Sequence, residues 1–139
     1  MTLLKKYGSK AWFCMDKNKL KAQEWFKKAK HDLDAVNDII KGSAHPDVAG
    51  VLLQQCLEKY LKGYLLSKGW KLIKTHDLKQ LLDEAVKFHA HFRNYYDLTD
   101  VLTEYYIEER YPFGETEISI EEIKENLKKV KELIRFIKQ

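Results

Sequence analysis

The chain has 139 residues, of which 45% are hydrophobic and 33% are charged. This size suits one globular domain with a real core and leaves no room for two. The formal net charge of +4 suits an anionic partner, although the positive residues are spread along the chain. No segment reaches the roughly 18 consecutive apolar residues of a membrane span, and residues 1–19 lack an apolar block before a small-residue cleavage site. We therefore expect a cytoplasmic protein that does not associate with membranes.

The cysteine and histidine content gives no metal or disulfide signature. Cys14 and Cys56 lie far apart and neither belongs to a CxxC motif, which favours buried or incidental thiols. His89 and His91 form a pair without a cysteine or carboxylate at a typical ligand spacing. We expect no metal site and no cofactor.

Two long helices are predicted in the first half of the chain. The first runs from about Leu20 to Lys41, with apolar residues at three- and four-residue steps. These are Ala22, Trp25, Phe26, Ala29, Leu33, Val36 and Ile40. The second opens near Asp47, ends at Gly69 and is apolar enough to be the central helix. Its apolar side carries Leu53, Leu57, Leu61, Tyr64 and Leu65.

A third and a fourth helix follow. Thr75 or Asp77 could cap a short helix that runs to about Phe88. Its inward residues would be Leu78, Leu81, Leu82 and Ala85. The fourth helix should cover Phe92 to Glu109 and end at the Pro112 and Gly114 break. Its inward residues would be Tyr95, Leu98, Val101, Leu102 and Tyr105.

The last helix has the most regular pattern. Ser119 and Glu122 fit a capping box. The apolar residues then step by three or four along the helix, at Ile120, Ile123, Leu127, Val130, Ile134 and Ile137. With no strand pattern and no repeat, the sequence predicts an all-α, antiparallel up-and-down bundle of four to five helices over residues 20–139. Residues 1–19 form a leader that either docks on this bundle or covers a partner's surface.

Three segments resemble the HEPN domain family. The second helix contains a Gln-Gln, Glu-Lys and Lys run within residues 51–66. The Thr-His-Asp-Leu step at residues 75–78 and the Glu-Arg-Tyr-Pro step at residues 109–112 follow in the expected order. The resemblance spans about Leu20 to Lys138 and implies a HEPN-type bundle that is usually homodimeric. It also implies a small nucleotidyltransferase protein as partner, in a toxin–antitoxin or defence system.

Many members of this family are metal-independent ribonucleases, with an Arg followed after four to six residues by a His. The arginines here are Arg93, Arg110 and Arg135, and no His follows any of them at that distance. Leu98 stands where the His after Arg93 would be needed. Cleavage of RNA needs a group that accepts the 2′-hydroxyl proton, which leucine cannot do. The sequence therefore favours binding of a nucleotide or RNA over its cleavage.

Several residues are candidates for that binding. Arg110 and Tyr106 lie one helical turn apart, where they could hold a phosphate and stack a base. His76 lies at a helix start, where free N–H groups favour anions. Each has a structural alternative: Arg110 could bond the last carbonyls of its helix or pair with a neighbouring glutamate, and His76 could bond backbone near the cap.

The second helix also carries a polar strip. It consists of Gln54, Gln55, Glu58, Lys59 and Lys62, and its two lysines could contact phosphate. The alternative is that Glu58 pairs with Lys62 at i, i+4 on a solvated face. Two lysine clusters, at residues 27–30 and 128–131, are most simply solvated faces, although together they could form a basic surface for RNA phosphates.

Three functions stay open at this point. The first is a nucleotide- or RNA-binding interaction module. Its proposed ligand contacts are Arg110, Tyr106, His76, Lys59, Lys62 and Arg93. The second is a divergent metal-independent ribonuclease that uses the same region, with a pair such as His76 and Arg110 replacing the missing motif. The third is a structural helical dimer without a ligand.

Overall fold

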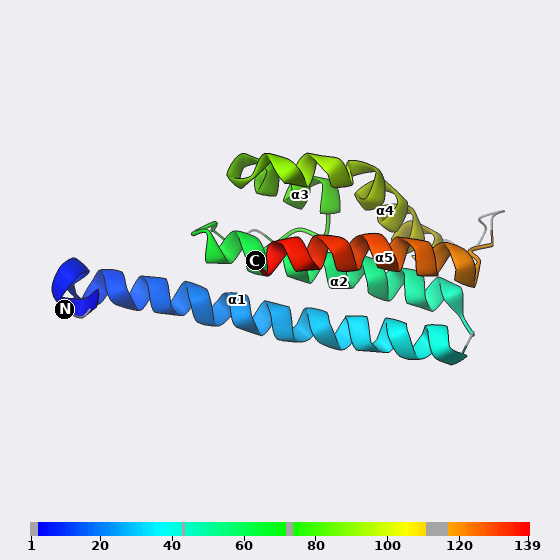
Figure 1. The fold of residues 1–139 in the computed structure, drawn as a ribbon, viewed down its shortest axis with the longest axis horizontal. Helices are drawn as coiled ribbons and strands as arrows, with labels where there is room; N and C mark the ends of the chain where they lie inside the picture. Colours follow the sequence, from blue (N-terminus) through cyan, green and yellow to red (C-terminus); the bar gives the residue numbers. More distant parts are fainter. Residues whose placement is uncertain (1–2, 43, 72–73, 111–116) are drawn as a thin grey trace.

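The computed structural model describes residues 3–42, 44–71, 74–110 and 117–139, with side chains described from residue 17 onward except those of 108–110. Within these ranges the chain forms five α-helices and one 3-10 helix and contains no strand (Figure 1). In chain order the elements are α1 (Leu3–Gly42), α2 (Pro46–Ser67), α3 (Leu78–Phe88), η1 (Ala90–Tyr95), α4 (Tyr96–Arg110) and α5 (Ile120–Ile137).

Helix α2 is the centre of the bundle. It packs against α1, α3, α4 and α5, and Figure 1 shows α1 and α2 side by side, with α5 along α2 and α3 with α4 beyond them. Leu53, Leu57, Leu61 and Leu65 of α2 are fully buried, as their spacing of four residues predicts. The predicted all-α bundle with the second helix at its centre is confirmed.

Helix α1 is longer than predicted. The sequence pattern placed its start at about Leu20, but the helix begins at Leu3 and includes most of the leader. Residues 3–19 contain no proline, and a single glycine at position 8 costs only about 1 kcal/mol within a helix. The side chains of residues 1–16 lie outside the described part of the chain, so docking of the leader stays a prediction.

The predicted helix starts are mostly confirmed. The Asp77 carboxylate accepts hydrogen bonds from the backbone N–H groups of Lys79 and Gln80 at 3.0 and 3.4 Å, so Asp77 rather than Thr75 caps α3. Ser119 accepts from the N–H of Glu122 at 3.1 Å and caps α5. Both caps satisfy N–H groups that have no partner within the helix.

The fourth helix differs from the prediction at its start. Residues 90–95 form the 3-10 helix η1, and the α-helix begins at Tyr96. The ring of Phe92 packs between Tyr64 of α2 and Phe136 of α5, with centroids 4.8 and 5.2 Å away. A 3-10 turn is common at the terminus of an α-helix and as a connector between helices, and η1 occupies such a position between α3 and α4. The predicted break at residues 111–114 lies outside the described residues.

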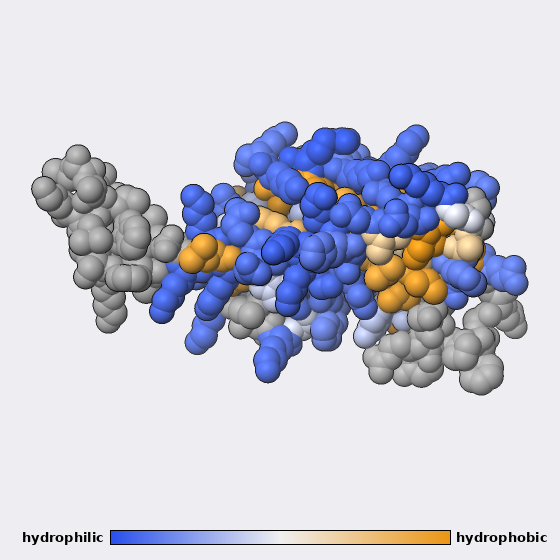
Figure 2. Space-filling model, turned by 90° about the horizontal axis from the view of Figure 1, so that it is seen from below, coloured by the Kyte–Doolittle hydropathy of each residue, from blue (hydrophilic) through white to orange (hydrophobic). Residues whose placement is uncertain are grey.

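The surface is mostly hydrophilic when seen from below, with a group of hydrophobic residues toward the right-hand end of the view (Figure 2). Among the described residues, the exposed large hydrophobic side chains are Leu20, Val48, Phe88 and Ile107. No helix in the described ranges is both long and apolar enough to cross a bilayer.

Candidate functional site

A line of polar side chains on α2 is buried inside the bundle. Gln54, Glu58 and Lys62 are 2%, 5% and 4% exposed. Lys62 Nζ donates to Glu58 Oε2 at 3.2 Å. The predicted i, i+4 pair is therefore present, but the prediction of a solvated face is wrong. The pair must compensate the desolvation of both charges, which costs several kcal/mol per ion when uncompensated.

Glu58 also holds His76, which precedes the Asp77 cap of α3. Nδ1 of His76 lies 3.1 Å from Oε1 and 3.3 Å from Oε2 of Glu58. The His76 side chain is 77% exposed while that of Glu58 is 7% exposed. The alternative in which the His76 ring bonds only to backbone is wrong, because the ring bonds to a buried carboxylate. With Nδ1 bonded, Nε2 is the ring nitrogen available to a ligand.

Gln54 completes this cluster and leaves one polar atom unsatisfied. Its Nε2 donates to the backbone carbonyl of His76 at 3.4 Å. Its Oε1 is buried and has no hydrogen-bond partner in the described structure. A buried acceptor without a partner costs about 1–3 kcal/mol. A buried water molecule that donates to this atom would remove that cost.

The two lysines of the strip have structural partners. The Lys62 ammonium group contacts Glu58 and also lies over the ring of Trp25 from α1, with Nζ 5.1 Å from the ring centroid. Lys59 donates to Asp32 of α1 at 2.5 Å, and both side chains are largely buried. Because both ammonium groups already face partners, Lys62 contributes charge within the cluster and Lys59 joins α1 to α2.

Tyr106 lies in a different part of the bundle from the Glu58–His76 pair. An ideal Cβ at Gly50 would meet the Tyr105 ring at 3.0 Å, so the half-buried neighbour Tyr106 lies near the first turns of α2. Gly50 and Glu58 are eight residues apart on that helix, or about 12 Å along its axis. The Arg110 side chain lies outside the described residues.

Arg93 is not brought to the cluster by any described contact. It is exposed on η1, and η1 is fixed through Phe92 to Tyr64, which lies near the C-terminal end of α2. Among the candidates whose side chains the structure describes, the contacts join His76 and Lys62, through Glu58.

Two members of the cluster were absent from the predicted ligand contacts: Gln54 and Glu58, which had been placed only in the polar strip. Their signal was present, since three polar residues four positions apart interrupt a helix that is otherwise apolar. Trp25 carried no such signal, because an aromatic residue on the apolar face of α1 is expected in the core.

The described residues contain no group of three or more His, Cys, Asp or Glu side chains able to hold a metal ion. The His91 ring packs on Phe136 with centroids 4.3 Å apart, and His89 Nδ1 accepts from the His91 N–H at 3.1 Å. Cys56 is fully buried, as predicted. Its burial, reinforced by the negative charge of Asp32, raises the pKa of the thiol to about 12.

Comparison with known proteins agrees with the sequence resemblance. The model of the HEPN domain matches residues 22–139. The crystal structure of TT1696 from Thermus thermophilus has a similar fold, with a TM-score of 0.68 and 23% sequence identity. The similarity covers 85% of this chain and 96% of that one. The search of curated proteins gave no significant match.

Proposed function

Because this chain belongs to the HEPN domain family, we propose that it is a cytoplasmic module that binds a nucleotide or an RNA fragment at the Glu58–His76 pair. The observation that carries this proposal is the exposed imidazole held by a buried carboxylate at 3.1 Å. Burying the Glu58 carboxylate costs free energy. A surface that contacts only water would gain nothing from using that carboxylate to hold an exposed imidazole.

The pair would act by orienting the imidazole. Nδ1–H donates to the Glu58 carboxylate, which fixes the ring and directs Nε2 outward. In the protonated ring, Nε2–H donates a charge-assisted hydrogen bond to a phosphate oxygen. The Asp77 carboxylate already caps the N-terminus of α3, so the contact to the anion in this proposal rests on the His76 ring.

The other candidate residues extend this proposal. Tyr106 of α4, whose neighbour Tyr105 lies against Gly50 about 12 Å along α2 from Glu58, would stack a base of a longer ligand. Arg110 would hold a further phosphate of that ligand. Lys59 and Lys62 are already paired with Asp32 and Glu58. They and Arg93 are therefore left without a direct ligand contact in this site.

The partners follow the same family reasoning. We propose a homodimer that pairs with a small nucleotidyltransferase protein, in a toxin–antitoxin or defence system. A group of hydrophobic residues lies at one end of the surface in Figure 2, and a contiguous apolar patch favours burial in a protein interface. Sedimentation at several protein concentrations would test the homodimer. A monomer at every concentration would refute that part of the proposal.

The binding test uses two probes, a fluorescent ATP analogue and an oligouridine RNA. His76→Gln should weaken binding of at least one probe about tenfold, since one charge-assisted hydrogen bond is lost. His31→Gln is the matched control, because His31 is an exposed histidine on α1. Binding of neither probe, or equal binding by both variants and the unmodified protein, would refute the site.

A second function rests on the same pair. A neutral imidazole whose Nδ1–H is held by a carboxylate presents Nε2 as a proton acceptor, the arrangement of a general base. A divergent ribonuclease would therefore cleave RNA without added metal and lose that activity in His76→Gln and Arg110→Ala. Intact RNA after incubation with pure protein would exclude it and leave the binding function.

A further inference from the structure

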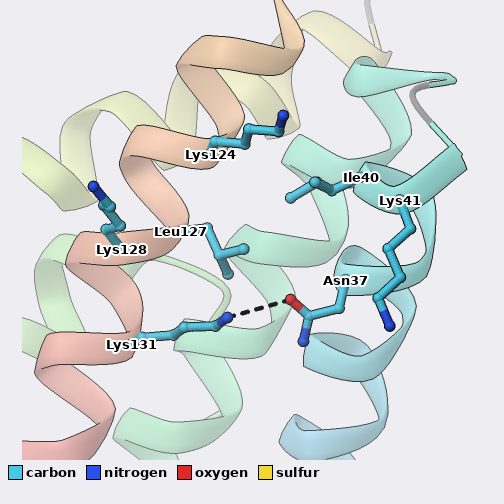
Figure 3. Close-up of a pocket in the computed structure, with 7 residues that line it drawn as sticks. All are labelled: Asn37, Ile40, Lys41, Lys124, Leu127, Lys128 and Lys131. Atoms are coloured by element: carbon cyan, nitrogen blue, oxygen red, sulfur yellow. Dashed lines mark hydrogen bonds between the residues drawn. The ribbon is translucent and has the colours of Figure 1, made fainter.

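A groove with a volume of about 490 Å³ lies between the C-terminal end of α1 and the α5 helix (Figure 3). The α1 side is formed by Asn37, Ile40 and Lys41, and the α5 side by Lys124, Leu127, Lys128 and Lys131. None of these residues belongs to the Glu58–His76 cluster. The groove is therefore a separate feature of the surface.

The groove carries four lysines that are not engaged in ion pairs with any described residue. Lys131 donates to the Asn37 amide oxygen at 3.4 Å, and none of the four groove lysines forms an ion pair with a carboxylate in the described part of the chain. Lys124 and Lys128 are four residues apart on one helix, a spacing at which like charges repel. An anionic occupant would relieve that repulsion.

The floor of the groove is aliphatic. Figure 3 shows Ile40 and Leu127 between the two helices, with lysine side chains around them. The described lining contains neither an aromatic ring nor an arginine. Single-stranded nucleic acids are usually bound by stacking their bases on such groups. Carboxylates carried beside aliphatic side chains match this lining better than a nucleic acid does.

The lysine spacing suits a helical occupant. Lys124, Lys128 and Lys131 lie on one side of α5 at steps of four and three residues, or about 6 and 4.5 Å along the axis. Carboxylates at steps of three and four residues on an antiparallel helix have the same separations. Apolar side chains between those carboxylates would reach Ile40 and Leu127, as in helix-in-groove recognition.

We propose that this groove docks an acidic amphipathic helix of a partner protein. The proposal rests on the interaction role given under the proposed function and deepens it by naming the surface and the chemistry of the partner. It does not depend on nucleotide binding at His76, because the two surfaces share no residue.

The test uses a labelled helical peptide of roughly 20 residues with three glutamates at steps of three and four residues and leucines between them. Lys124→Glu/Lys128→Glu should weaken peptide binding about tenfold or more. Lys19→Glu/Lys27→Glu is the control, because it makes the same change in net charge at exposed positions of α1 outside the groove. A peptide with lysines in place of the glutamates should bind the Lys124→Glu/Lys128→Glu protein more tightly than the unmodified one.

The failures of the two proposals can be told apart. The Lys124→Glu/Lys128→Glu protein should keep the affinity of the unmodified protein for the ATP analogue. No peptide binding, equal loss in the control variant, or unchanged binding after leucine-to-serine changes in the peptide would overturn the groove proposal. So would an oligouridine RNA that binds more tightly than the peptide and loses binding in the groove variant, since that would make the groove a nucleic-acid site.

Discussion

Glu58 accepts a hydrogen bond from Lys62 at 3.2 Å and also lies 3.1 Å from the His76 ring, although the helix that carries Glu58 is otherwise the core of the bundle. Glu58→Gln should lower the free energy of unfolding by about 3 kcal/mol, because it leaves the Lys62 charge buried without an anion. Urea unfolding measures this loss. The double variant Glu58→Leu/Lys62→Leu should recover most of it, because apolar residues can replace a buried pair. A loss below about 0.5 kcal/mol in Glu58→Gln would mean that the pair is solvated.

The close approach of α1 and α2 depends on Gly63. A Cβ at that position would lie 2.6 Å from a ring carbon of Phe26, so Gly63→Ala must displace the ring or the helix. We expect a loss of about 1–3 kcal/mol in the free energy of unfolding. Gly42→Ala is the control, because its Cβ would meet nothing within 4 Å. It should be neutral or stabilise the helix by about 0.5–1 kcal/mol. Equal effects of the two substitutions would contradict this packing.

The Tyr105 hydroxyl joins α4 to α5. It donates to Glu122 at 2.7 Å and accepts from the Asn126 amide at 2.7 Å. Tyr105→Phe should cost about 1–3 kcal/mol, since Asn126 is buried and loses its acceptor. Tyr96→Phe removes a more exposed hydroxyl bond to Asp83 and should cost less than about 1 kcal/mol. Thermal unfolding of the two variants would compare them, and a larger effect at Tyr96 would argue against the buried network.

Alkaline pH should destabilise the protein through Cys56 and Tyr60. Burial raises the pKa of each to about 12, whereas the same groups in an unfolded chain ionise at about 8.5 and about 10. The unfolded chain therefore loses its protons first as the pH rises. The stabilising contribution is complete below about pH 8 and declines toward pH 12, by up to about 1.4 kcal/mol per pH unit for a single group. Cys56→Ala should show a smaller decline than the unmodified protein between about pH 8 and about pH 10.5 in urea unfolding. If the free energy of unfolding declined equally with pH in Cys56→Ala and in the unmodified protein, ionisation of Cys56 would not be a cause of the decline.

The sequence determined the helices, because a helix face is a local pattern. The steps of three and four apolar residues and the Asp77 and Ser119 caps depend on neighbours within one or two turns, and the structure has them at those positions. The start of a helix was harder to predict where the local pattern is weak, as at Leu3 and at Tyr96. The polar strip on α2 was also visible, because its residues share a face by spacing alone.

Only the tertiary structure decided what that strip contacts. Sequence spacing cannot show that Trp25 covers Lys62 or that a residue 18 positions away bonds to Glu58. The groove arises in the same way, since Lys41 and Lys124 are distant in the chain and line one groove because α1 and α5 lie beside it. Local periodicity fixes which side of a helix is polar. The packing of other helices decides whether that side faces water or lies buried, and so whether Glu58 is a surface charge or the buried partner of His76.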